Sequence, residues 1–99
     1  MRIKLSRRAA AELEYHFEIG VGRFGPLIAG RTFARVRHLI FDLLAANPEM
    51  GTYHRNREVF ESVVARTPFV IFYRYDGKSD ITVVAIFNQS QGRDWFEML

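Results

Sequence analysis

Residues 69–75, FVIFYRY, are apolar at every position before Arg74. Aromatic and β-branched residues without a polar face are typical of a central strand that is covered on both sides. The next segment, Asp76–Asp80, contains Gly77 and is typical of a hairpin loop. Ile81–Phe87 then alternates, so its odd-numbered residues are expected to share one face. The two runs predict neighbouring antiparallel strands at the centre of a sheet.

Two further strands are expected to flank this pair. In Glu58–Arg66, the residues Val59, Phe60, Val63 and Val64 suit a strand with both faces partly covered, and Thr67-Pro68 follows as a turn. Because the connections are short, Glu58–Arg66 and the two later runs predict an antiparallel meander. Arg2–Leu5 alternates basic and apolar residues, and we expect it to join the sheet at an edge.

Helical periodicity fills the first half of the chain. We expect one helix over roughly Arg7–Ile19, capped by Ser6, and a second over roughly Leu27–Ala46, ended by Pro48. The segment Gly20–Pro26 contains three glycines and a proline and is predicted to be a loop. The order β-α-α-β-β-β predicts an α+β fold: an N-terminal strand, a two-helix hairpin and a three-stranded antiparallel meander, forming a single sheet with helices on one face.

Composition limits the classes of protein to consider. The 99 residues are expected to form one domain, residues 1–99, and the 48% apolar fraction argues against disorder. There is no cysteine, and neither His16 nor His38 has a second histidine at i+4, so neither a metal nor another cofactor is expected. The start is too poor in apolar residues for a signal peptide, and no window is long enough to span a membrane. A cytoplasmic protein without membrane contact is expected.

The charge is uneven along the chain. The net charge is +3, and twelve of the fourteen basic residues are arginine. Up to Arg57 there are ten basic and five acidic residues, whereas from Glu58 onward there are four and six. Arginine grips carboxylate and phosphate through paired hydrogen bonds. The pattern indicates either an anionic partner or simply solvated helix faces.

A small set of residues could serve phosphodiester chemistry. His54 is expected in a donor-rich loop, Tyr53–Arg57, where it could act as a general acid or base or simply face solvent. Strand ends that gather on one edge of a meander could bring arginines together to hold an RNA phosphate. The same arginines could equally form structural ion pairs with Glu58, Glu61 or Asp94. The nuclease candidates are His54, Arg57, Arg66, Arg74 and Arg93.

Four segments together resemble the RelE/ParE family of bacterial toxins. Leu5–Ala9 is similar to the strand-to-helix start of these toxins, and Asn47–Gly51 to the turn after their second helix. Arg66–Tyr75 is similar to their central hairpin, and Ile81–Asp94 to their last strand with its Arg-Asp ending. Each motif alone is weakly specific, but their order and spacing cover nearly the whole chain. The resemblance implies the toxin of a type II toxin–antitoxin pair, associated with plasmid stabilisation and growth inhibition.

The family divides by target, and this chain looks closer to ParE than to RelE. It is poor in lysine, has no Tyr or His after Tyr75, and has Asn88 where many relatives carry histidine. Arginine does not readily supply a proton at neutral pH, so a general acid is lacking at that end. The resemblance therefore implies a toxin that inhibits DNA gyrase by binding it, without enzymatic turnover. The alternatives are a ribosome-dependent mRNA endonuclease and an inactive family member.

The resemblance also implies surfaces for partners. A cognate antitoxin is expected to bind in a hetero-oligomer, laying apolar anchors on the toxin and placing acidic groups near its arginines. The candidate antitoxin-binding residues are Arg31, Phe33 and Arg35. The C-terminal aromatic residues could either dock on the core or contact the target. The candidate target-binding residues are Arg74, Arg93, Trp95 and Phe96.

Overall fold

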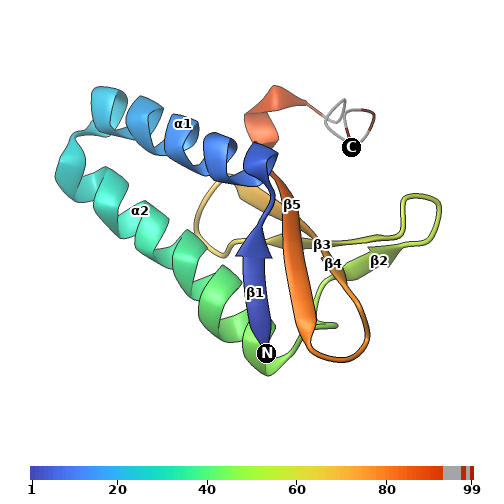
Figure 1. Cartoon of the computed structure of the whole chain (residues 1–99). Helices are drawn as coiled ribbons and strands as arrows, with labels where there is room; N and C mark the ends of the chain where they lie inside the picture. The colour runs from blue at the N-terminus through green and yellow to red at the C-terminus, as the bar shows by residue number, and fades with distance from the viewer. Residues whose placement is uncertain (93–96, 98) are drawn as a thin grey trace.

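The computed structural model, which describes residues 1–92, 97 and 99, consists of a helical hairpin packed on one face of a sheet (Figure 1). The sheet has five strands in the order β1-β5-β4-β3-β2. β1 (Arg2–Leu5) pairs with β5 in parallel, and all other neighbours are antiparallel. The α+β class, the edge position of the first strand and the placement of both helices on one face are confirmed.

The three strands of the meander lie close to their expected positions. β4 (Phe69–Tyr75) has the expected bounds, β5 (Asp80–Asn88) is one residue longer at each end, and β3 (Val59–Val63) is shorter than expected. A short strand that the sequence did not reveal, β2 (Thr52–His54), pairs with β3 at the edge. His54 therefore ends a strand, and the expectation of a loop at this position was wrong.

The expected loop over Gly20–Pro26 is also wrong, because α1 (Arg7–Phe24) continues through Gly20 and Gly22. A Cβ atom on Gly20 would lie 3.5 Å from the Cβ of Ala29 in the second helix. Close packing of the two helices at this small residue compensates for its low helix propensity. Only Gly25, at φ 85°, breaks the helix, and Pro26 then starts the next one, where its missing N–H costs nothing.

The second helix is continuous but not uniform. α2 (Pro26–His38) leads into a π-turn, η1 (Leu39–Leu43), and then into α3 (Leu44–Ala46). The amide of Leu44 bonds to the carbonyl of Leu39, five residues earlier, which is the π-type hydrogen bond. The expected span Leu27–Ala46 thus matches the observed helix within one residue at its start.

A β-bulge in β5 changes which residues face the helices. Phe72 pairs with Ala85 while Tyr73 pairs with Val83, so Val84 is the extra residue. Before the bulge Ile81 and Val83 face the helices, whereas after it Ile86 does so, and Ala85 and Phe87 belong to the opposite face. The expectation that the odd-numbered residues share one face was therefore wrong.

Two side chains of α1 provide hydrogen-bond partners for the edge of β5 in the part where β1 does not pair with it. The register of β1 against β5 ends at Val83, which would leave the later backbone groups of β5 without a strand partner. The carboxylate of Glu12 accepts a hydrogen bond from the Ile86 amide at 2.9 Å, and Nε2 of His16 lies 3.1 Å from the Ile86 carbonyl oxygen. His16 is a half-buried residue of α1. Because Glu12 and His16 lie one helical turn apart, they serve both polar groups of one residue.

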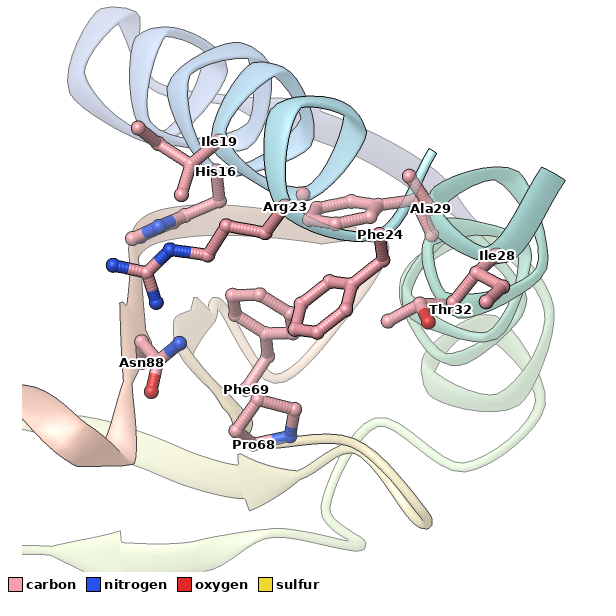
Figure 2. Close-up of a pocket in the computed structure, with 12 residues that line it drawn as sticks. His16, Ile19, Arg23, Phe24, Ile28, Ala29, Thr32, Pro68, Phe69 and Asn88 are labelled. Atoms are coloured by element: carbon pink, nitrogen blue, oxygen red, sulfur yellow. The ribbon is translucent and has the colours of Figure 1, made fainter. Parts of the chain in front are cut away.

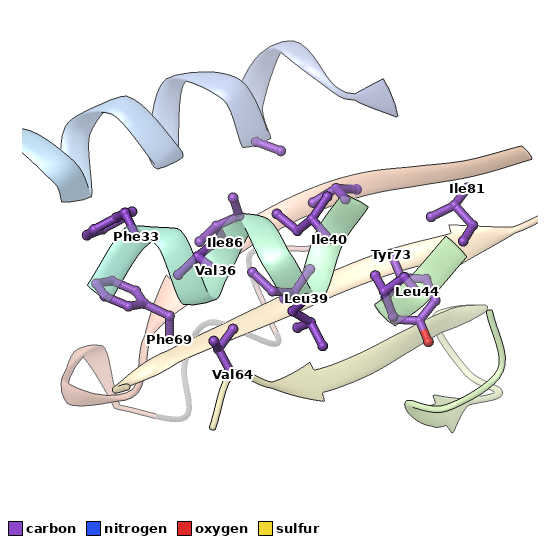
Figure 3. Packing of buried hydrophobic residues seen from close by; sticks show 13 residues of the cluster. Phe33, Val36, Leu39, Ile40, Leu44, Val64, Phe69, Tyr73, Ile81 and Ile86 are labelled. Carbon is purple, nitrogen blue, oxygen red and sulfur yellow. The ribbon is translucent and has the colours of Figure 1, made fainter. Parts of the chain in front are cut away.

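The main core lies between the helices and the sheet (Figure 3). Phe33 of α2 packs edge-on against Phe17 and lies 5.0 Å from Phe69 between ring centroids. Tyr73 stacks on Phe60 and accepts a hydrogen bond from the Gly51 amide at 3.1 Å. Burial raises the pKa of Tyr73, more than the hydrogen bond from Gly51 lowers it, so Tyr73 is a neutral packing residue.

Candidate functional site

The sheet face turned away from the helices carries a second apolar cluster, which we call the open face. Its fully buried members are Val59, Val70, Phe72, Ala85 and Phe87. The guanidinium of Arg8, at the start of α1, lies 5.1 Å from the centre of the Phe87 ring, a cation–π arrangement. The open face thus carries a buried apolar layer that includes two aromatic rings, with a cation at its margin.

Three of the nuclease candidates lie at one end of the open face. Arg74 follows Phe72 on the same side of β4, and its guanidinium donates to the carbonyl oxygen of Arg57 at 3.4 Å. Nε2 of His54 lies 2.7 Å from the Glu61 carboxylate, and both side chains are about three-quarters buried. His54 and Arg57 also share a backbone hydrogen bond. This arrangement joins the strand ends by polar contacts, and the His54 imidazole is already engaged by a carboxylate.

Arg66 does not join this group, so the expected convergence of the arginines was wrong for it. Arg66 lies in the turn between β3 and β4, at φ 64°, whereas Arg74 lies at the far end of β4. Seven strand residues separate the two ends by roughly 20 Å. Antiparallel strands alternate in direction, so the ends of successive strands fall on opposite edges of the sheet.

Two described residues near the C-terminus contact the open face or its margin. Leu99 packs against its apolar cluster, and the Glu97 carboxylate lies 3.6 Å from the Arg57 guanidinium. Three of the expected target-binding residues, Arg93, Trp95 and Phe96, lie outside the described residues. Their assignment stays a prediction, as does a role for Arg93 in phosphate binding.

A groove runs between α2 and the free edge of β3, which we call the α2–β3 groove. β2 pairs with β3 only as far as Glu61, so the following residues of β3 border the groove with an unpaired edge. The groove has a volume of about 540 Å³. It is lined by Ala34, Arg35, His38, Leu39, Leu43, Met50, Val63, Val64, Ala65 and Arg66. Of its apolar residues, Leu43, Met50 and Val63 are each 40–52% exposed.

The expected antitoxin contacts fall into two groups. Arg31 and Arg35 are exposed on α2, and Arg35 belongs to the groove. Phe33 is only 1% exposed and packs in the main core. Its ring is enclosed by Phe17 and Phe69, so Phe33 offers no exposed surface, and its assignment as an antitoxin contact stays a prediction.

A second cavity, the hairpin pocket, lies where the tip of the helical hairpin meets the end of β5 (Figure 2). Its volume is about 290 Å³. Apolar residues of both helices and of β4 form its walls, and three polar side chains gather at one end. The polar side chains at that end are His16, Arg23 and Asn88, and Thr32 is a further polar lining residue.

Sequence reasoning missed both cavities. Arg23 and Phe24 were assigned to a loop because of their neighbouring glycines, although they form the last turn of α1. Leu27 and Ile28 lie outside the buried stripe of α2 and are 67% and 52% exposed. Apolar residues off the buried stripe were the available signal of an exposed patch.

Within the described residues, no group of three His, Cys, Asp or Glu side chains is arranged to hold a metal ion.

No helix in the described part of the chain combines the length and the apolar character needed to cross a membrane.

Comparison with known proteins identifies the class. The sequence profile of the family described as "ParE toxin of type II toxin-antitoxin system, parDE" matches residues 3–93. The chain therefore belongs to the ParE family of toxins from type II toxin–antitoxin systems. The resemblance stated from the sequence is confirmed. No curated protein sequence matches the chain significantly.

Solved structures agree in fold. A chain from the chromosomal ParDE toxin–antitoxin system of P. aeruginosa superposes with a TM-score of 0.68 at 27% identity, covering 89% of this chain and 95% of that one. A chain of the RelBE2 toxin–antitoxin complex of Mycobacterium tuberculosis superposes with a TM-score of 0.62 at 18% identity, covering 88% of each chain. The second similarity is one of fold alone.

Proposed function

We propose that this ParE-family toxin inhibits DNA gyrase in the cytoplasm by binding it, and that a cognate antitoxin neutralises it. The observations that carry the proposal are the distance of Arg66 from the other described nuclease candidates and the engagement of the His54 imidazole by a carboxylate. Arg66 and Arg74 lie at opposite ends of β4, and His54 is engaged by Glu61. A ribonuclease needs its acid, base and phosphate-binding groups within hydrogen-bond reach of one phosphodiester. Binding to a protein surface has no such requirement.

The open face is the surface we assign to the target. It offers buried aromatic rings at its centre and the exposed Arg74 at its edge. Aromatic and arginine side chains are enriched among the interface residues that dominate affinity. Leu99, which packs on this face, would have to move for a partner to reach the rings.

Purified toxin tests this function directly in a gyrase supercoiling assay. We expect loss of supercoiling or trapping of cleaved DNA–gyrase complex. Arg74→Ala should weaken inhibition, whereas Arg37→Ala, on the exposed side of α2, should not. Uninhibited gyrase at a large excess of folded toxin would contradict the proposal.

For the antitoxin we propose the α2–β3 groove. Its exposed apolar residues can receive the anchors of an amphipathic segment, while Arg35 and Arg66 border it with positive charge. The unpaired edge of β3 can in addition pair with an extended segment. The P. aeruginosa and M. tuberculosis structures come from toxin–antitoxin systems, which supports a partner of this kind.

Co-purification tests the groove. Reversing the charge in Arg35→Glu and Arg66→Glu should each weaken capture of the antitoxin, mainly through slower association. Arg37→Glu is the matched control, because this exposed arginine of the same helix does not line the groove. If all three variants retain the antitoxin equally, the groove is not its docking surface.

A further inference from the structure

The hairpin pocket has an apolar end and a cationic end. Phe24 of α1, Ile28 of α2 and Phe69 of β4 line the apolar end, and Phe24 and Ile28 are more than half exposed there. Figure 2 shows the Arg23 guanidinium between the His16 ring and the Asn88 side chain. None of the described residues that line the pocket is acidic. None of these described lining residues therefore neutralises the permanent charge of Arg23.

Hydrogen bonds fix the donors at the cationic end. The Asn88 side-chain oxygen accepts from the Ser90 amide at 2.8 Å, which leaves the Asn88 NH₂ group as a donor. Figure 2 shows that nitrogen on the side of the Arg23 guanidinium. Nε2 of His16 faces the Ile86 carbonyl, so it must carry the proton, and the imidazole is held as a flat wall. The Arg23 guanidinium and the Asn88 NH₂ group thus lie on the same side of the pocket, and no described residue that lines it offers a carboxylate to them.

We propose that the hairpin pocket binds a small carboxylic acid with an aromatic or branched apolar body. The carboxylate bonds to Arg23 and Asn88, and the body packs on Phe24, Ile28 and Phe69. A planar guanidinium matches a carboxylate through two parallel hydrogen bonds. The volume of about 290 Å³ is at the lower end of small-ligand sites. This site is separate from the open face and the α2–β3 groove, and it does not depend on the proposed function.

The shared chemistry, an apolar body ending in a carboxylate, occurs both in free metabolite-sized acids and at the C-terminus of a polypeptide. Two probes separate these sources: 3-phenylpropionate represents the free acid, and N-acetylphenylalanine represents a terminal residue. The neutral control is 3-phenylpropanol, which has the same apolar body. Tighter binding of one of the two acids identifies the source, and binding of either acid supports the site.

The test is a titration of the isotope-labelled full chain followed by NMR. We expect a Kd of about 0.1–1 mM for at least one acid, with shifts centred on His16, Phe69 and Asn88, and binding of the alcohol at least about tenfold weaker. Equal binding of acid and alcohol would overturn the carboxylate assignment. No saturable binding of either acid would overturn the site.

Arg23→Gln provides the second measurement. This substitution should weaken binding of the acid at least about tenfold and binding of the alcohol less than about twofold, because only the acid interacts with the guanidinium charge. Arg31→Gln is the matched control, an exposed arginine of the same hairpin that does not line the pocket. If Arg23→Gln leaves acid binding unchanged, the proposal is wrong. If this variant does not fold, the comparison of acid and alcohol binding to the unmodified chain still tests whether the pocket recognises a carboxylate.

Discussion

Removing the carboxylate of Glu12 tests how much the hydrogen bond from α1 to the edge of β5 stabilises the fold. The Ile86 amide donates to Glu12 at 2.9 Å, and Ile86 is 0% exposed. In Glu12→Ala this amide loses its acceptor in a place that water does not reach easily. A lost hydrogen bond to a charged group at a buried donor costs about 2 kcal/mol. For a domain of this size, that lowers the melting temperature by roughly 10 °C.

Glu12→Gln is the matched control. The glutamine keeps an oxygen that can accept from the Ile86 amide, but like alanine it loses the ion pair with Arg8 at 3.3 Å. That pair is partly exposed and contributes about 0.2–1 kcal/mol. The difference between the alanine and glutamine variants therefore isolates the hydrogen bond to the strand edge.

Thermal unfolding and amide hydrogen exchange measure the effect. We expect Glu12→Ala to melt well below Glu12→Gln, and the Ile86 amide to exchange faster in the alanine variant. An exposed strand edge also invites pairing between chains, so Glu12→Ala should aggregate more readily on heating. If the two variants melt within about 1 °C of each other and Ile86 stays protected in both, the reasoning about the edge is refuted.

Two further substitutions test separate parts of the fold. A Cβ atom on Gly51 would lie 2.8 Å from the Glu61 carbonyl oxygen and 2.9 Å from the Tyr73 hydroxyl, so Gly51→Ala should destabilise by about 1–3 kcal/mol in urea unfolding; an unchanged midpoint would contradict this packing. Three backbone amides donate to the Asp76 carboxylate and lower its pKa below 3.8, with that of Asp80 the largest contributor. A lowered pKa contributes stability above the unfolded value and loses it as the pH falls. Asp76→Ala should therefore have a lower melting temperature than the unmodified chain at pH 6, and the difference in melting temperature should narrow as the pH falls below 3.8. A difference in melting temperature that is constant with pH would contradict the role of the carboxylate.

The central strands could be predicted from the sequence because their pattern of apolar residues is typical of one kind of structure. An uninterrupted apolar run such as Phe69–Tyr75 suits a strand that is covered on both faces, and its bounds were correct. The bulge at Val84 could not be read in this way. Val83–Phe87 is apolar on both faces, so a shift of one residue in this part of the strand leaves the hydrophobic pattern unchanged.

The glycines of α1 show a different limit. Local propensity disfavours helix at Gly20 and Gly22, but packing of Gly20 against Ala29 occurs only once the hairpin has formed. Tertiary contacts therefore keep this segment helical although its local sequence predicts a loop. β2 was missed for a similar reason, since three residues are too few for a periodicity signal.

The candidate site was partly within reach of sequence reasoning. The direction of successive antiparallel strands already places Arg66 and Arg74 at opposite ends of β4, so their convergence could have been excluded. The pairing of His54 with Glu61 could not be foreseen, because it depends on the register of β2 against β3. The two cavities likewise depend on how the helices lie on the sheet.

A competition between the two possible targets tests the central claim most directly. Purified toxin is added to one reaction that contains gyrase with relaxed plasmid and translating ribosomes with a defined mRNA. The account predicts loss of supercoiling, relief of the inhibition when antitoxin is added, and intact mRNA. Cleavage of the mRNA at defined codon positions, with gyrase still active, would contradict it.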